Sequence, residues 1–242
     1  MSANSEVLQR AELLLGADVL DAVKNARVAV FGVGGVGSWC VEALVRTGVR
    51  RLMLVDSDRV CESNINRQMM ATTRTVGRAK VEAIAERLRE INPAVELELR
   101  DQFYDATTAD SFDLAQWDFV VDAIDSLDSK VLLIRRALAV PTVTLFSSMG
   151  AARKLDPFQI RRDNFKKVSG DGLARALRRK FRETGGIPER PFVCVWSPEQ
   201  RDNIGEAEPV NGKRPNGTVM HVTASFGLAL ASLVLEKFAV CS

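Results

Sequence analysis

The stretch VFGVGGVGS, residues 30–38, decides the fold of this chain. It closes a short, β-branched apolar run, 27–31, and leads into a run with helical spacing, 38–47. Its glycines allow a tight turn and let phosphate groups approach backbone N–H groups at the positive end of the helix. We therefore predict a strand, a helix and, between them, a nucleotide-binding loop that contains Gly32, Gly34, Gly35 and Gly37.

Outward from this loop, segments typical of strands and helices alternate. A segment with helical spacing also precedes the loop, at 11–24. The further strands that we expect are 51–55, 95–100, 119–123 and 142–146, and the further helices are 76–91 and 130–139. Such alternation predicts an α/β fold with a Rossmann-like, doubly wound and mainly parallel sheet.

The charge of the chain is concentrated in one short region after this alternation stops. Residues 151–182 carry 11 Lys and Arg against 3 Asp and Glu, whereas residues 1–150 carry 17 against 21. We expect residues 1–150 to be the nucleotide-binding core, and residues 151–242 to complete the same domain with a basic excursion and C-terminal elements. A basic excursion is a candidate contact for a polyanion.

The composition excludes several classes of site and location. The 46% hydrophobic content is enough for a large core, and the four cysteines include no C-x-x-C pair, which argues against a structural zinc site and a disulfide framework. His221 is the single histidine, so a Ser-His-Asp triad or a multi-histidine metal site would rest on it alone. Charges interrupt the apolar run 219–240, which predicts a buried terminal helix and no membrane span. The first residues have no signal pattern, so we expect a cytoplasmic protein.

Polar residues downstream of the loop indicate which nucleotide is bound. Asp56 ends the second expected strand, 19 residues past Gly37, where a carboxylate can bind a ribose hydroxyl. A site for a dinucleotide needs no further cluster of cations, because the helix dipole and backbone amides can bind its single pyrophosphate group. Cations and amides that follow favour a nucleoside triphosphate. These further candidate nucleotide-binding residues are Asp58, Asn64, Arg67, Gln68 and Lys80.

Six ordered blocks resemble the ubiquitin-activating superfamily, which includes the thiamine- and molybdopterin-pathway adenylyltransferases. The blocks are VFGVGGVGS, LVDSD, SNINRQ, VGRAK, EINP and DAIDS. The resemblance implies binding of ATP with Mg²⁺, the ribose at Asp56, the metal at Asp125 and the phosphates at Asn64, Arg67 and Lys80. Arg10 resembles an N-terminal arginine that reaches the partner subunit's triphosphate, which implies a homodimer with composite sites.

The C-terminal part resembles a particular branch, the tRNA threonylcarbamoyladenosine dehydratases. The matching text is SSMGAARKLDP, a stretch from 163 to 182, VCVWSPE and PNGTV. This resemblance implies a tRNA substrate that carries threonylcarbamoyladenosine beside the anticodon, a side chain that is activated by adenylation, and a cyclic product. A sulfur-relay protein partner and a bound monovalent cation stay open, as do the roles of Cys61 and Cys194.

The basic stretch is an independent reason to expect tRNA, because arginine and lysine contact phosphates. The stretch also fits a helix with a solvated charged face, since few aromatic residues accompany it. Its cations are Arg153, Lys154, Arg161, Arg162, Lys166, Lys167, Arg175, Arg178, Arg179, Lys180 and Arg182.

Three other functions compete with the dehydratase. The first is an adenylyltransferase for the C-terminus of a ubiquitin-like sulfur-carrier protein, although members of that branch commonly have two C-x-x-C pairs and this chain has none. The others are an NAD-dependent oxidoreductase and a non-catalytic RNA-binding module. The order of the six blocks favours an ATP-dependent enzyme over both.

Overall fold

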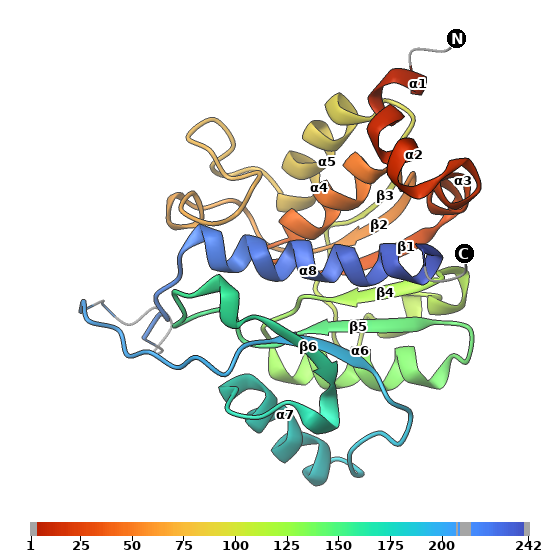
Figure 1. Cartoon of the computed structure of the whole chain (residues 1–242). Helices are drawn as coiled ribbons and strands as arrows, with labels where there is room; N and C mark the ends of the chain where they lie inside the picture. The colour runs from red at the N-terminus through yellow and green to blue at the C-terminus, as the bar shows by residue number, and fades with distance from the viewer. Residues whose placement is uncertain (1–3, 207, 209–213, 240–242) are drawn as a thin grey trace.

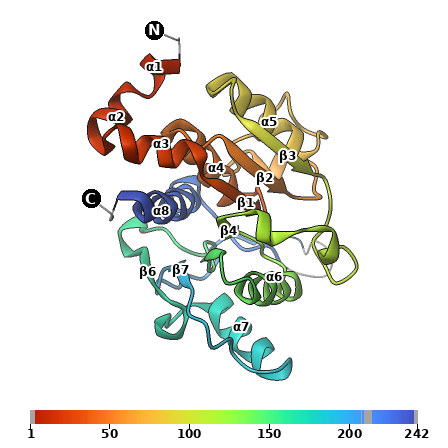
Figure 2. The ribbon, with the colours of Figure 1, turned by 90° about the vertical axis from the view of Figure 1, so that its right-hand side faces the viewer.

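The protein has three layers, with one sheet between two groups of helices (Figures 1 and 2). The computed structural model describes residues 4–206, 208 and 214–239. The strands are β1 (Arg27–Phe31), β2 (Arg51–Val55), β3 (Glu96–Arg100), β4 (Phe119–Asp122), β5 (Thr144–Ser148), β6 (Arg161–Asn164) and β7 (Val193–Trp196). The helices are α1 (Asn4–Val7), α2 (Gln9–Leu15), α3 (Ala17–Asn25), α4 (Gly37–Thr47), α5 (Lys80–Ile91), α6 (Leu127–Ala139), α7 (Gly172–Glu183) and α8 (Met220–Ala239).

The sheet has the order β3-β2-β1-β4-β5-β7-β6, and only the pairing of β6 with β7 is antiparallel. The chain runs from β1 outward to β3 and then returns to β4 on the other side of β1. The prediction of a Rossmann-like, doubly wound and mainly parallel sheet is therefore confirmed. In such a sheet, ligands bind outside the carboxyl ends of the strands where the strand order reverses, which is here between β1 and β4.

Each face of the sheet has its own apolar core. On one face, α3, α4, α5 and α8 cover the sheet, and Val30, Leu44 and Phe226 are among the side chains they bury. On the other face, α6 and α7 cover it, around side chains such as Phe31 and Phe181. The view in Figure 2 separates these two groups of helices. Alternate side chains of one strand thus enter different cores, as the buried run predicts.

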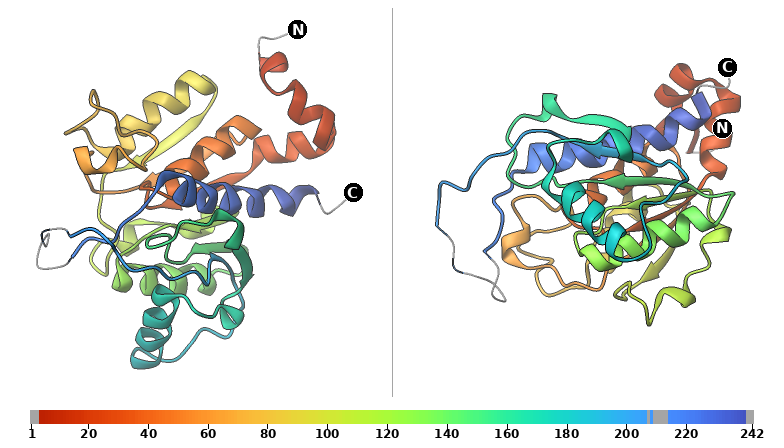
Figure 3. Two further views of the ribbon diagram at one scale, coloured as in Figure 1. Left: turned by 60° about the vertical axis from the view of Figure 1, so that its left-hand side comes forward. Right: turned by 90° about the horizontal axis from the view of Figure 1, so that it is seen from below.

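Helix α8 crosses the sheet and lies against α4 (Figure 1). In the described part of the chain it is the one helix long and apolar enough to span a membrane, but half of that segment is buried inside the protein. A Cβ at Gly227 would lie 2.3 Å from the Val36 carbonyl oxygen and 2.9 Å from the Cys40 nitrogen. Glycine therefore lets α8 approach the start of α4 closely, as expected of a core helix. Figure 3 shows α3 beside the far end of α8.

Some element boundaries differ from the sequence prediction. The N-terminal helical segment is two helices, because Gly16 between them has a φ of 82°. The helix expected over 76–91 begins at Lys80, since Gly77 has a φ of 86° and ends the preceding turn. Strand β6 was not predicted from its charged sequence.

Candidate active site

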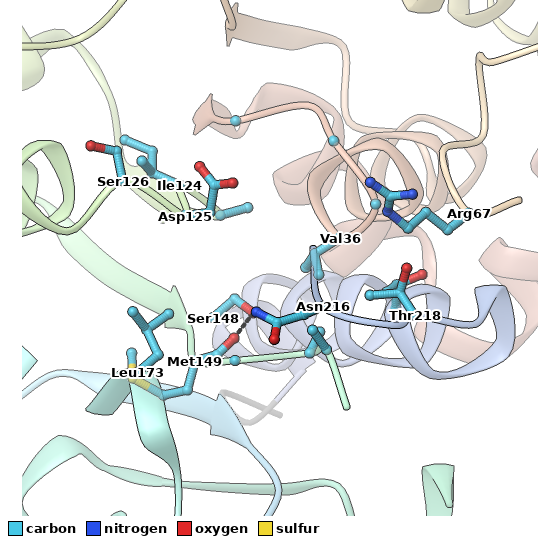
Figure 4. Close-up of a pocket in the computed structure, with 18 of the residues that line it drawn as sticks. Val36, Arg67, Ile124, Asp125, Ser126, Ser148, Met149, Leu173, Asn216 and Thr218 are labelled. Atoms are coloured by element: carbon cyan, nitrogen blue, oxygen red, sulfur yellow. Dashed lines mark hydrogen bonds between the residues drawn. The ribbon is translucent and has the colours of Figure 1, made fainter. Parts of the chain in front are cut away.

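A pocket of about 740 Å³ opens at the carboxyl ends of β1, β2, β4 and β5. Residues from the loops that follow these strands line it, which is the position that the reversal of strand order predicts. Predicted site residues in its lining are Gly32, Gly34, Gly35, Asp56, Asp58, Arg67, Gln68, Lys80 and Asp125. Figure 4 shows Arg67 on one side of the pocket and Asp125 on another.

The glycine loop is tight because two glycines pack against backbone. Gly32 has a φ of 86°, and a Cβ there would lie 2.7 Å from the Ala123 carbonyl oxygen. A Cβ at Gly37 would lie 1.9 Å from the Gly32 carbonyl oxygen. Gly37 therefore closes the turn from behind and does not line the pocket, whereas the backbone of Gly34 and Gly35 faces it.

Asp56 holds the glycine loop as well as facing the pocket. Its Oδ2 accepts a hydrogen bond from the Val33 N–H at 2.9 Å, and its Oδ1 accepts one from the Asp58 N–H at 2.9 Å. Burial raises the pKa of Asp56, against the opposing charge of Lys80 and these backbone hydrogen bonds. A carboxylate fixed in this way can accept a further hydrogen bond from a ribose hydroxyl.

Lys80 is the first residue of α5 and is almost fully buried. Its Nζ donates to Asp58 Oδ2 at 2.7 Å and lies 3.9 Å from Asp56 Oδ1. The ammonium group therefore has a fixed place at the edge of the pocket. A compact cation in that place suits a phosphate group.

Arg67 and Gln68 come from the segment that precedes α5. Arg67 donates to the Ser63 carbonyl oxygen at 2.8 Å and to Asn66 Oδ1 at 2.9 Å, and it packs on Gly35. Burial lowers the pKa of Arg67, which the nearby charge of Asp125 opposes. The buried Gln68 Oε1 has no hydrogen-bond partner within the described residues. Because buried amides are normally satisfied, an unpaired oxygen at a pocket fits a site that a polar ligand completes.

Asp125 follows β4 and is exposed to the pocket. Its carboxylate has no hydrogen bond or ion pair with any described residue, unlike Asp56. The described residues contain no group of three or more His, Cys, Asp or Glu side chains that could hold a metal by themselves. One free carboxylate fits Mg²⁺, because that ion is usually bound through one or two carboxylates together with substrate phosphates.

Besides Gly37, two predicted residues lie outside the pocket lining. The side chain of Asn64 accepts a hydrogen bond from the Cys61 N–H at 3.2 Å and caps a short turn. Arg10 is exposed on α2, away from the lining residues. Within one copy of the chain, neither side chain meets the cluster around Asp56 and Lys80.

The pocket continues into a second half that the sequence analysis did not assign. Its lining includes Ser148, Met149, Gly150, Lys154, Asp171, Leu173, Asn216 and Thr218, several of which are labelled in Figure 4. The buried Lys154 donates to the carbonyl oxygens of Ser197 and Glu199 at 2.9 and 2.6 Å, and burial lowers its pKa. Lys154 therefore organises loops at the wall of the pocket and is not a surface phosphate contact.

A buried ion pair beneath the β4–α6 loop was also missed. Lys130 and Asp122 are both fully buried, and Lys130 Nζ lies 2.8 Å from Asp122 Oδ2. The signal in the sequence was an aspartate that ends an apolar strand and a lysine in the following helix. Asp122 is the first residue of the block DAIDS, but only Asp125 of that block was assigned a role, and Lys130 lies outside the six blocks.

Many of the basic residues in 151–182 have partners within the chain. Arg178 donates to the carbonyl oxygens of Phe165 and Val168, Lys180 pairs with Asp128 at 2.6 Å, and Arg162 pairs with Glu236. Such cations are less available to a ligand than the sequence implied. Exposed cations of the stretch whose side chains pair with no other described residue are Lys166, Lys167, Arg175 and Arg182.

The two cysteines left open have different surroundings. Cys194 is buried in β7, and burial raises its pKa, so the thiol is disfavoured as a nucleophile. Cys61 is exposed in the turn that Asn64 caps. Neither lines the pocket.

Comparison with known proteins places these features in a family. The model of the ThiF family matches residues 8–177. The tRNA threonylcarbamoyladenosine dehydratase of Bacillus subtilis is 42% identical over 234 residues, which cover 93% of this chain and 92% of that protein. A crystal structure of the Escherichia coli tRNA N6-threonylcarbamoyladenosine dehydratase in complex with AMP superposes with a TM-score of 0.91 at 32% identity, over 100% of this chain and 97% of the other. The same enzyme in complex with ATP gives a TM-score of 0.88 at 33% identity, with the same coverage. On sequence and structure together, the chain belongs to the ThiF family.

Proposed function

We propose that the protein is an ATP-dependent tRNA threonylcarbamoyladenosine dehydratase. The observation that carries this proposal is one continuous pocket, in which nucleotide-binding features from four loops face a second, unassigned half. The near full-length similarity to two bacterial dehydratases supports the same substrate and ATP as its activator. A tRNA-modifying enzyme of this kind acts in the cytoplasm.

The reaction begins with a carboxylate that cannot expel oxide by itself. The threonyl carboxylate of the substrate attacks the α-phosphorus of ATP, the bond to the β-phosphate breaks, and pyrophosphate leaves. The resulting acyl-adenylate has AMP as a good leaving group. An atom of the neighbouring carbamoyl group then attacks the activated carbonyl carbon, and AMP departs with the former carboxylate oxygen. The substrate thus loses the elements of water and gains a ring.

The proposed roles of the pocket residues follow from their charge and place. Asp56 binds the ribose, and the glycine loop, Arg67 and Lys80 bind the phosphates and stabilise charge that develops on them. Asp125 holds Mg²⁺, which neutralises phosphate charge when it is bound. Because ring closure is intramolecular, these residues mainly orient groups, and the scheme needs no covalent enzyme intermediate. Asp58, Gln68 and Asn64 support this nucleotide site.

Arg10 completes the site from a second copy of the chain. This role accounts for an arginine that lies outside the pocket of its own subunit, and it makes the protein a homodimer with composite sites. In this arrangement residues 1–150 supply the nucleotide half, and residues 151–242 supply the tRNA contacts of the same domain. The second half of the pocket receives the modified adenosine.

Mass spectrometry of nucleosides tests the proposal directly. Transfer RNA that carries threonylcarbamoyladenosine, incubated with the enzyme, ATP and Mg²⁺, should lose 18 mass units at that nucleoside, the mass of one water. NAD in place of ATP should give no product. Pyrophosphate exchange that depends on a ubiquitin-like carrier protein, and not on tRNA, would instead identify a carrier adenylyltransferase. ATP binding without any exchange would leave only an RNA-binding role.

A further inference from the structure

Burial of the ion pair between Lys130 and Asp122 carries a large desolvation penalty. Both side chains are fully inaccessible to solvent, and removing two charges from water generally costs more than their attraction returns. Lys130 also occupies the first turn of α6, where the helix dipole disfavours a positive charge. An apolar pair of the same size would serve the core at least as well. The stability of the core therefore does not explain these two residues.

The contacts of the pair indicate another role. Asp122 Oδ1 accepts a hydrogen bond from the Ile124 N–H at 3.2 Å, and Lys130 Nζ donates to the Ile124 carbonyl oxygen at 3.0 Å. The pair thus holds both peptide groups of Ile124. The next residue is Asp125, whose carboxylate faces the pocket (Figure 4). The orientation of that carboxylate depends on a backbone that the ion pair fixes.

Two further contacts make this support rigid. Ser147 Oγ donates to Asp122 Oδ2 at 2.7 Å, which ties the pair to β5. On the opposite side, the absence of a side chain at Gly32 lets the glycine loop pack against the Ala123 carbonyl group. The segment 123–125 is therefore clamped between the ion pair and the phosphate-binding loop. Such a clamp sets the distance from the Asp125 carboxylate to the loop that cradles the nucleotide.

We infer that Lys130 and Asp122 form a positioning unit that holds the Asp125 carboxylate in the geometry needed for the magnesium–nucleotide complex. This inference rests on the role proposed above for Asp125. Neither Lys130 nor Asp122 lines the pocket, so both act through the backbone of the loop and not by touching the ligand. Residues that orient a metal ligand typically change metal affinity by about 10- to 100-fold when they are lost.

The main test replaces both charges together, as Asp122→Asn with Lys130→Met. Removal of one partner alone would leave an unpaired buried charge and would confuse positioning with unfolding. In the double variant, the Ile124 carbonyl group loses its donor while the volume of the core is kept. Binding of a non-hydrolysable ATP analogue is measured by calorimetry over a Mg²⁺ series, and Mn²⁺ binding by electron paramagnetic resonance gives a second readout without turnover.

A matched control lies at the other end of the same helix. Arg190 donates to the carbonyl oxygens of Leu138, in the last turn of α6, and of Val140, Pro141 and Val143, which follow the helix. Arg190→Met removes a cation that satisfies backbone carbonyl groups, as the main variant does, but far along the helix from Asp125. We expect this control to lower thermal stability and leave the Mg²⁺ dependence unchanged.

The double variant should need about 10- to 100-fold more Mg²⁺ for half-maximal nucleotide binding, with similar affinity for the analogue without metal. An unchanged Mg²⁺ dependence in the folded double variant would overturn the inference. If that variant does not fold, Ser147→Ala keeps the ion pair but removes the hydrogen bond from Ser147 to Asp122. This variant should show a smaller increase in the Mg²⁺ concentration needed for half-maximal binding. No increase would count equally against the inference.

Asp125→Asn separates this inference from the proposed function. If Asp125→Asn leaves the Mg²⁺ dependence unchanged, the metal role of Asp125 is wrong, and the positioning inference falls with it. If Asp125→Asn weakens Mg²⁺ binding and the double variant does not, the metal role stands and only the positioning inference fails.

Discussion

Gly32 and Gly77 have the same backbone φ but different surroundings. Substitutions at the two positions therefore distinguish the cost of backbone strain from the cost of a steric clash. Both have a φ of 86°. A side chain at Gly77 would meet nothing within 4 Å, whereas one at Gly32 would strike the Ala123 carbonyl oxygen. Left-handed geometry costs a non-glycine residue about 1–2 kcal/mol.

We predict that Gly77→Ala loses about 1–2 kcal/mol of unfolding free energy and keeps its affinity for ATP. Gly32→Ala should lose more stability and also most of its ATP affinity, because the clash displaces the loop that the phosphates approach. Urea unfolding and calorimetric ATP titration measure the two effects. Equal behaviour of the two variants would mean that the contact with Ala123 does not shape the nucleotide site.

At the level of single residues, the sequence could predict which residues gather at one edge of the sheet, because glycine turns and strand-ending acids carry local signals. Arg67, Lys80 and Asp125 indeed reach one pocket. The sequence could not predict which charged side chains would be buried or paired within the protein. Arg178 donates to a backbone carbonyl group 13 residues away, and Lys130 pairs with Asp122 at the end of the preceding strand. The sequence does not indicate that either contact buries a charge.

Between elements, one carboxylate joins α4 to α5. Glu42 Oε2 accepts from Arg87 Nε at 2.6 Å, and its Oε1 accepts from Arg46 Nε at 2.8 Å. Burial of Glu42 opposes its ionisation, but the two arginines outweigh burial and hold the pKa of Glu42 below its usual value. A carboxyl whose pKa is lowered by folding stabilises the protein above its ordinary pKa, and that stability is lost as the pH falls through the lowered value.

Glu42→Gln should therefore reduce the free energy of unfolding by about 1–2 kcal/mol at pH 7. This value allows for solvent screening of the two ion pairs, because both arginine side chains are about half exposed. The difference from the unmodified protein should shrink as the pH falls below about 4.5. Glu98→Gln, which breaks an exposed pair with Arg100, is the control and should change stability by less than about 0.5 kcal/mol. Denaturant unfolding over a pH series measures these free energies. If the variant stays equally destabilised at low pH, the stabilisation by Glu42 does not come from its charge.

The elements were predicted where hydrophobic period and turn residues agree, as in β1, β2 and α4. The sequence failed at β6, Arg161–Asn164, because an edge strand with no apolar alternation is defined by the partner strand it pairs with. The place of β7 in the sheet likewise depends on tertiary contacts, because the chain makes a long excursion after β5 before β7 returns to pair beside it. Such pairing is tertiary information that no local window contains.

For the molecule as a whole, we predict that the unpaired cations of the basic stretch bind tRNA. Replacement of Lys166, Lys167, Arg175 and Arg182 by Gln should weaken binding and make the salt dependence shallower, by up to roughly 0.9 in the log–log slope for each lost contact. The ATP affinity should not change. Filter binding over a salt series measures the slope.

The control for this experiment removes equal charge elsewhere, at Lys24, Arg51, Arg74 and Arg89, which also lack ion-pair partners among the described residues. It should leave the slope nearly unchanged. If both variants behave alike, net charge alone attracts the tRNA and the basic stretch has no special role.

The proposed composite site predicts rescue between inactive subunits. Arg10→Ala and Asp125→Ala should each abolish dehydration, since each removes one part of both sites in a homodimer. A mixed dimer can assemble one site that carries both residues, so mixing should restore up to about half of the activity per mixed dimer. Activity after demonstrated subunit exchange is the measurement. No recovery would place Arg10 outside the site.

The contact of Gly227 with the start of α4 has a consequence for protein synthesis. The proposed nucleotide-binding loop packs against α8, which is made last among the described helices. A nascent chain with residues 220–239 still inside the ribosomal tunnel has β1 and its glycines but lacks the surface behind them. Ribosome-bound chains should therefore be unable to retain ATP until this helix emerges. Competence for the nucleotide would then arrive only after all seven described strands of the sheet have been made.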